Sequence, residues 1–62
     1  MNIKQAQQEI EYGFPVYCET PAVKFRAAKI VKHANGNVDI TDLYGETIRI
    51  AREDLVLVKF HR

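Results

Sequence analysis

The chain of 62 residues contains no tryptophan, one cysteine, one methionine, two prolines and three glycines, and serine is absent from it. The absence of serine removes the commonest hydroxyl nucleophile of hydrolytic enzymes. A single cysteine cannot form an internal disulfide, and secreted domains of this size usually need several. No apolar run approaches the roughly 18 residues that span a membrane. These absences predict a cytoplasmic protein without a membrane partner.

Size and composition are those of a small globular domain. Hydrophobic residues make up 47% of the chain and charged residues 27%, as in folded rather than disordered proteins. A chain this short holds one domain, residues 1–62, and its start lacks the apolar core of a signal peptide. We therefore expect a complete small gene product.

The first segment, residues 2–12, has the pattern of a short amphipathic helix. Its apolar side chains fall on one stripe at helical spacing, formed by Ile3, Ala6 and Ile10. Asn2 is a favourable N-cap, and Gly13 can end the helix in the left-handed conformation. Three turns are marginal alone in water, so the stripe must pack on an apolar surface.

The remaining chain reads as short strands separated by turns. Apolar and polar residues alternate in five segments, at 14–19, 23–33, 38–43, 47–51 and 55–60. The doublet Ala27-Ala28 shifts the alternation, which predicts a β-bulge in the long second strand. Asn35-Gly36 and Tyr44-Gly45-Glu46 predict hairpin turns, and residues 52–54 predict a single 3₁₀ turn.

This order of elements predicts a mainly β fold: a five-stranded SH3-like barrel over residues 14–60, covered at one end by the helix at 2–12. The expected core comprises Ile30, Val38, Ile40, Ile48, Ile50, Leu55 and Val58, with Ala28 where two strands approach closely. An OB-like or cold-shock barrel is the alternative, although those barrels usually run longer.

Two resemblances together cover nearly the whole chain. One set of residues resembles the SH3-like superfold of Tudor, KOW and many bacterial domains: Lys29-Ile30-Val31-Lys32, Asn35-Gly36, Val38-Asp39-Ile40, Asp42, Gly45, Ile48 and Asp54-Leu55. The segment Gly13-Phe14-Pro15-Val16-Tyr17-Cys18, which leads from the predicted helix into the barrel, is similar to that of small phage and mobile-element proteins of Gram-positive bacteria. SH3-like barrels bind peptides, methylated side chains, nucleic acids or ribosomes, so the resemblance implies binding without naming a ligand.

The residues present argue against three specific functions of SH3-like domains. A KOW domain has a glycine in its first strand pair and a more basic surface, which Phe25-Arg26-Ala27 does not offer. A methyl-lysine reader needs several aromatic residues beside an acid; Tyr17, Tyr44, Asp39 and Asp42 are the residues available. A peptide-binding SH3 domain of the signalling kind uses a tryptophan-bearing groove, and this chain has no tryptophan.

Basic residues concentrate in the second predicted strand and favour nucleic-acid binding as one hypothesis. Residues 24–33 contain no acid and carry the predicted nucleic-acid-binding residues Lys24, Arg26, Lys29 and Lys32, to which Arg49 is added from a neighbouring strand. The whole chain has a net charge of only +1, which weakens this hypothesis. The alternative is a solvated strand whose lysines discourage edge-to-edge aggregation.

Aromatic residues favour a second hypothesis, a protein-binding surface. Six aromatic residues are more than a core of this size needs. The predicted protein-binding residues are Tyr17, Phe25 and Tyr44, which we expect to be partly exposed and able to anchor a protein partner or a second copy in a homodimer. The alternative is that these side chains fill the interior of a barrel without tryptophan.

No motif in the chain predicts catalysis, a metal or a cofactor. Cys18, His33 and His61 match no zinc spacing, and no third group is evident to orient a histidine base. The sequence therefore predicts a non-enzymatic binding module for protein–protein interaction or small assembly, with no cofactor. Nucleic-acid binding through Lys24–Lys32 is the alternative function.

Overall fold

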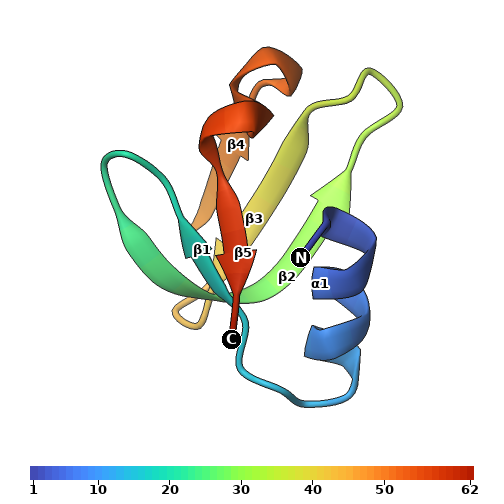
Figure 1. Ribbon diagram of the computed structural model, residues 1–62, viewed down its shortest axis with the longest axis vertical. Coiled ribbons are helices and arrows are strands. Elements are labelled where there is room, and N and C mark those ends of the chain that lie inside the picture. Colours follow the sequence, from blue (N-terminus) through green and yellow to red (C-terminus); the bar gives the residue numbers. More distant parts are fainter.

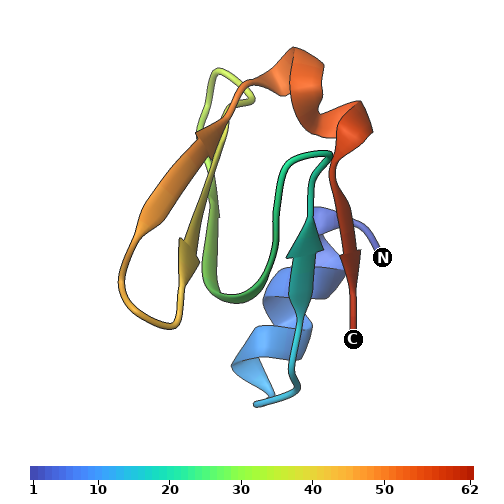
Figure 2. The same cartoon turned by 90° about the vertical axis from the view of Figure 1, so that its left-hand side faces the viewer.

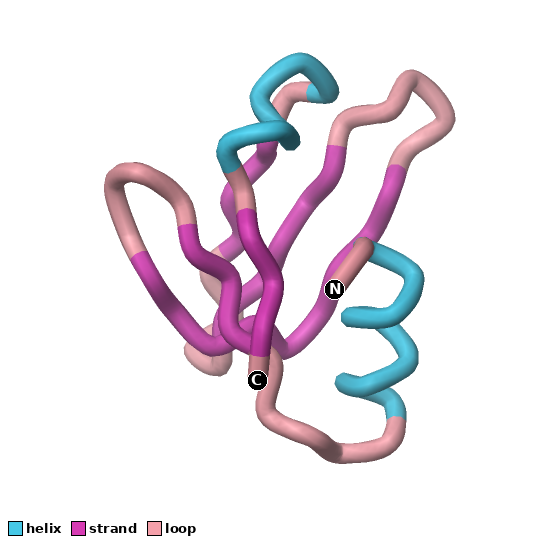
Figure 3. Tube along the Cα trace, in the orientation of Figure 1, coloured by secondary structure: helices cyan, strands magenta, loops and turns pink.

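A computed structural model describes residues 1–62, and one short helix precedes five strands (Figures 1 and 3). The elements are α1 (Ile3–Glu11), β1 (Tyr17–Glu19), β2 (Lys24–Lys32), β3 (Val38–Asp42), β4 (Thr47–Ile50), the 3₁₀ helix η1 (Arg52–Leu57) and β5 (Lys59–His61). No helix has the length and apolar character that crossing a membrane would require.

The long strand β2 connects two halves of one antiparallel sheet with the strand order β4-β3-β2-β1-β5. Its first limb, residues 24–27, pairs with β1, and its second limb, residues 29–32, pairs with β3. The register shifts between Ala27 and Lys29, as the Ala27-Ala28 doublet predicts, and such a bulge bends a strand. The two halves consequently face each other across the interior (Figure 2).

The mainly β fold with an N-terminal helix is confirmed, but closure into a barrel is not found. Strand β4 pairs only with β3, and β5 pairs only with β1. These two strands are therefore the free edges of an open sheet. The 3₁₀ helix η1 leads from one edge to the other without hydrogen-bonding them into a ladder (Figure 1).

The core lies between the two halves and is small. Its eight buried residues are Ala6, Val16, Cys18, Ala27, Ile30, Val38, Ile40 and Phe60. Three of the predicted core residues are among them, whereas Ile48, Ile50, Leu55 and Val58 are only partly buried against this cluster. The expectation for Ala28 is wrong: the bulge turns Ala28 outward, and its neighbour Ala27 is the buried one.

The helix α1 covers one end of the interior, as the sequence predicts. Ala6 is fully buried, and Ile3 and Ile10 pack against the core. Asn2 and Gln5 form a reciprocal capping box at the N-terminus. The Gln7 side chain donates a hydrogen bond of 2.7 Å to the carbonyl of Ile30, so the helix also caps a backbone group of the second limb.

Two hairpin loops have the same construction. A backbone hydrogen bond joins the two residues that flank each loop. The amide of His33 donates to the carbonyl of Asn37, and the amide of Asp42 donates to the carbonyl of Glu46. The third loop residue is a glycine with positive φ, 92° at Gly36 and 86° at Gly45. Three-residue hairpin loops favour this arrangement because glycine adopts positive φ without a steric penalty.

Strands β1 and β5 are shorter than the sequence predicts. Strand β1 begins at Tyr17 rather than at residue 14. The apolar run from Leu55 contributes mostly to η1, and strand pairing resumes only at Lys59. The reason is that η1 must carry the chain across the open side of the sheet before β5 can pair with β1.

We expect Ile40→Ala to destabilise the protein severely, because Ile40 is fully buried between both halves of the sheet. Such truncations typically cost about 2–5 kcal/mol, a large share of the stability of so small a domain. Urea unfolding followed by circular dichroism measures the loss. The control Leu43→Ala removes a side chain that is 58% exposed. Equal stability of the two variants would contradict the described core.

Candidate functional site

The first limb of β2 presents two different surfaces, because successive side chains of a strand point to opposite faces. Phe25 lies on the inner side, opposite the buried Cys18 of β1. Lys24 and Arg26 are exposed on the outer side, opposite Glu19 and Tyr17 respectively. The structure thus separates residues that are adjacent in the sequence into two candidate sites.

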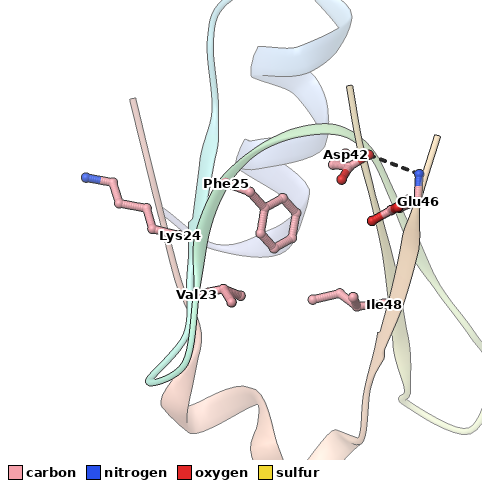
Figure 4. A pocket seen from close by; sticks show the side chains of 6 residues that line it. All are labelled: Val23, Lys24, Phe25, Asp42, Glu46 and Ile48. Atoms are coloured by element: carbon pink, nitrogen blue, oxygen red, sulfur yellow. Dashed lines mark hydrogen bonds between the residues drawn. The ribbon is translucent and has the colours of Figure 1, made fainter. Parts of the chain in front are cut away.

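The inner side forms an apolar cleft at the open side of the sheet, between β2 and β4. This Phe25 cleft has a volume of about 300 Å³ and is lined by Val23, Lys24, Phe25, Asp42, Glu46 and Ile48. Figure 4 shows Val23 and Phe25 pointing across it toward Ile48. Because Val23 remains 50% exposed, apolar surface is accessible at this opening.

The rim of the Phe25 cleft is acidic. The carboxylates of Asp42 and Glu46 stand at one side of it (Figure 4). Lys24 contributes its chain to the lining, but its ammonium points away from the cleft and lies 5.9 Å from the Tyr17 ring centroid on the outer side. The acidic rim therefore has no cation of its own to neutralise it.

A free backbone edge adjoins the cleft. Hydrogen-bonded and non-hydrogen-bonded residue pairs alternate along an antiparallel ladder. Asp42 and Glu46 close the β3–β4 loop as a hydrogen-bonded pair, so Thr47 and Arg49 belong to non-hydrogen-bonded pairs. This alternation directs the backbone groups of Thr47 and Arg49 away from β3, toward the side where β4 has no neighbour. An unpaired edge of this kind can accept an added strand.

The outer side of β1, β5 and the first limb of β2 carries a second candidate surface, the Tyr17 face. One cross-strand row consists of Arg26, Tyr17 and His61, and the next consists of Lys24, Glu19 and Lys59. The rings of Tyr17 and His61 stack, with centroids 6.0 Å apart and planes 25° apart. The Tyr17 face therefore places aromatic surface among basic side chains.

Three cations of the Tyr17 face have no ion-pair partner. The ion pairs of the protein are His33–Asp39, Arg49–Asp39, His61–Glu19 and Arg62–Glu9. Lys24, Arg26 and Lys59 are in none of them, and the only acid of the face, Glu19, accepts a hydrogen bond from His61 at 3.3 Å. With His61 neutral, the face carries a net charge of +2.

The remaining predicted nucleic-acid-binding residues lie elsewhere, so the basic stripe is divided. Lys29 is beyond the bulge, opposite Thr41 on the outer side of the second limb. Lys32 is opposite the buried Val38 and so belongs to the inner side, at the exposed end of the strand. Arg49 donates two hydrogen bonds to Asp39, of 2.9 and 3.2 Å.

The predicted protein-binding residues are likewise divided. Tyr17 lies among the cations of the outer side, whereas Phe25 lines the cleft. Tyr44 is 92% exposed at the tip of the β3–β4 loop and lines neither surface. Lys59 extends the basic surface from a neighbouring strand, as the sequence allows, whereas sequence reasoning missed His61 as its neighbour, although their alternation with the buried Phe60 indicates a shared outer side.

Asp39 holds the side chains of Arg49 and His33 on the outer side of β3. Its carboxylate accepts hydrogen bonds from Arg49 and, at 2.8 Å, from His33. These two hydrogen bonds, Arg49 first, keep the pKa of Asp39 well below its ordinary value, and Asp39 raises the pKa of Arg49. A similar pair joins Arg62 to Glu9 and lowers the pKa of Glu9.

The thiol and the two histidines do not form a joint site. Cys18 is fully buried in the core, and burial raises the pKa of its thiol to about 11. His33 is held by Asp39 and His61 by Glu19. The structure has no group of three or more His, Cys, Asp or Glu side chains placed to hold a metal ion.

Comparisons with known proteins found no matching family model, no similar curated protein and no similar solved structure. The resemblances stated from the sequence therefore stay predictions, and the candidate surfaces are argued from their own geometry.

Asp39 should make stability depend on pH in the acid range. Its pKa is lowered in the folded state, so its stabilisation is present above the unfolded pKa of about 3.9 and is lost as pH falls below it. We expect Asp39→Asn to be less stable than the parent at pH about 7, with the difference shrinking at pH about 2. Urea unfolding at the two pH values measures the difference in the free energy of unfolding between Asp39→Asn and the parent. The control Asp54→Asn removes a carboxylate that is in no ion pair, so its difference from the parent should not shrink at low pH.

Cys18 should resist alkylation in the folded protein, because it is buried and mostly protonated at neutral pH. Iodoacetamide labelling at pH about 8, followed by mass spectrometry, should be slow in buffer and fast in urea. Equally fast labelling in both would show that the thiol is accessible in the folded state.

Proposed function

We propose that the protein is a non-enzymatic binding module that accepts an extended segment of another polypeptide at the Phe25 cleft and the free edge of β4. The observation that carries this proposal is the coincidence of an accessible apolar cleft with an unpaired strand edge. An added strand would gain main-chain hydrogen bonds at the edge and place alternate side chains in the cleft.

The chemistry of the cleft favours a segment with alternating apolar and basic side chains. Val23, Phe25 and Ile48 offer apolar surface for one set of side chains. The carboxylates of Asp42 and Glu46 would attract the other set, since charge complementarity at a rim contributes to specificity.

We further propose that the open sheet is a variant of the SH3-like barrel. The strand order, with a long bent β2 shared by both halves, supports this, as does a 3₁₀ helix between the last two strands. The helix α1 would replace the missing closure by covering one end of the interior, which leaves the Phe25 cleft as the other opening.

A blocked hexapeptide of alternating valine and lysine tests the proposal. We expect amide NMR shift changes confined to residues 23–25, 42 and 46–50, because those residues line the cleft and the edge. Val23→Ser should weaken binding about fivefold, since it removes roughly 1 kcal/mol of apolar contact. Glu46→Lys should weaken it further, whereas Glu53→Lys, on the exposed η1, should not.

Two outcomes would count against this function. Equal binding of an alternating valine–glutamate hexapeptide would show that the acidic rim selects nothing. Light scattering over a dilution series tests self-association: we expect a 7.1 kDa monomer without peptide. A dimer dissociated by Val23→Ser would instead assign the cleft to a second copy of the chain.

A further inference from the structure

The Tyr17 face differs from the Phe25 cleft in both shape and charge. The two surfaces share only Lys24, whose chain lines the cleft while its ammonium lies on the face; the side chains that build the face stand on the outer side of β1, β2 and β5. Its ligand must therefore be recognised by surface contact with charges and rings rather than by insertion of apolar side chains.

The charges of this face are available to a ligand. Lys24, Arg26 and Lys59 are exposed and have no carboxylate within ion-pair distance. They come from the two strands that flank β1: Arg26 is opposite Tyr17, and Lys24 and Lys59 lie on either side of Glu19 in the adjacent row. An anionic ligand crossing β1 would therefore meet cations on both sides of this strand.

The aromatic part of the face adds a second kind of recognition. The stacked rings of Tyr17 and His61 lie on neighbouring strands, and the Lys24 ammonium lies 5.9 Å from the Tyr17 ring centroid. Both rings are partly exposed. Rings among unpaired cations suit a ligand that alternates phosphates with planar bases, because bases stack on aromatic side chains while the phosphates contact the cations.

We propose that the Tyr17 face binds single-stranded nucleic acid, with Lys24, Arg26 and Lys59 contacting phosphates and Tyr17 stacking on a base. This site shares only Lys24 with the Phe25 cleft, and of the strand Lys24–Lys32 it uses only the beginning. Single strands are favoured over a duplex because only their bases are free to stack on a protein ring. Lys29, Lys32 and Arg49 take no part in it.

Fluorescence anisotropy with labelled twelve-nucleotide oligo-dT and oligo-U tests the proposal. Three phosphate contacts predict that log K falls with log salt at a slope of about −2 for a single strand. The double variant Lys24→Gln/Arg26→Gln leaves one contact and should reduce the slope to about −0.7. The matched control Lys29→Gln/Lys32→Gln removes the same charge from the other limb and should leave slope and affinity unchanged.

The aromatic contribution is tested separately. Tyr17→Leu should weaken binding roughly 5- to 150-fold, the range expected for loss of one stacked base. Tyr17→Phe retains the ring and should bind as the parent does. Thermal melts establish that both variants are folded, and Val23→Ser, in the cleft, should bind oligonucleotide normally.

Several results would overturn the proposal. The absence of oligonucleotide binding at low salt would contradict the proposal. An equal loss of affinity in the two double variants would contradict it as well, because it would indicate diffuse charge attraction. If Tyr17→Leu binds as well as the parent, or if duplex DNA, heparin or anionic lipid vesicles compete as well as oligo-dT, the face is a general polyanion surface and not a single-strand site.

Discussion

The bulge in β2 is the constraint on which the rest of this structure depends. By placing Ala28 outside and Ala27 inside, it bends one strand so that its two limbs belong to facing halves of the sheet. The interior between those halves exists only because of this bend. A straight β2 would leave Ile30 and Cys18 on one flat surface that the single short helix could not cover.

Because the core is small, contacts outside it also hold the ends of the chain. Only eight residues are buried, so side chains at the periphery also hold the ends of the chain in place. Gln7 caps the Ile30 carbonyl, and the amino group of Met1 donates to the carbonyl of Phe60 at 3.1 Å. Arg62 lies 4.3 Å from the Phe14 ring centroid and pairs with Glu9, which ties the last residue to the helix.

The same strand limb supplies both proposed binding surfaces, on opposite sides. Phe25 contributes to the cleft, while Lys24 and Arg26 contribute to the Tyr17 face. Because neighbouring residues contribute to different surfaces, single substitutions can test the two proposed activities separately. A chain of nearly neutral net charge can have one locally basic face because seven of its eight acidic residues lie elsewhere, Glu19 being the only acid on the Tyr17 face.

The amino-acid sequence by itself determined the local structure. Asn2 and Gly13 delimit the helix, Gly36 and Gly45 supply the positive φ of the hairpin loops, and alternation marks the strands. These features depend on residues close together in the chain. Tertiary structure alone decided which alanine of the doublet is buried, that the sheet stays open, and that Tyr17 meets His61 from 44 residues away. The physical reason is that such pairings depend on how distant strands register, which no local pattern specifies.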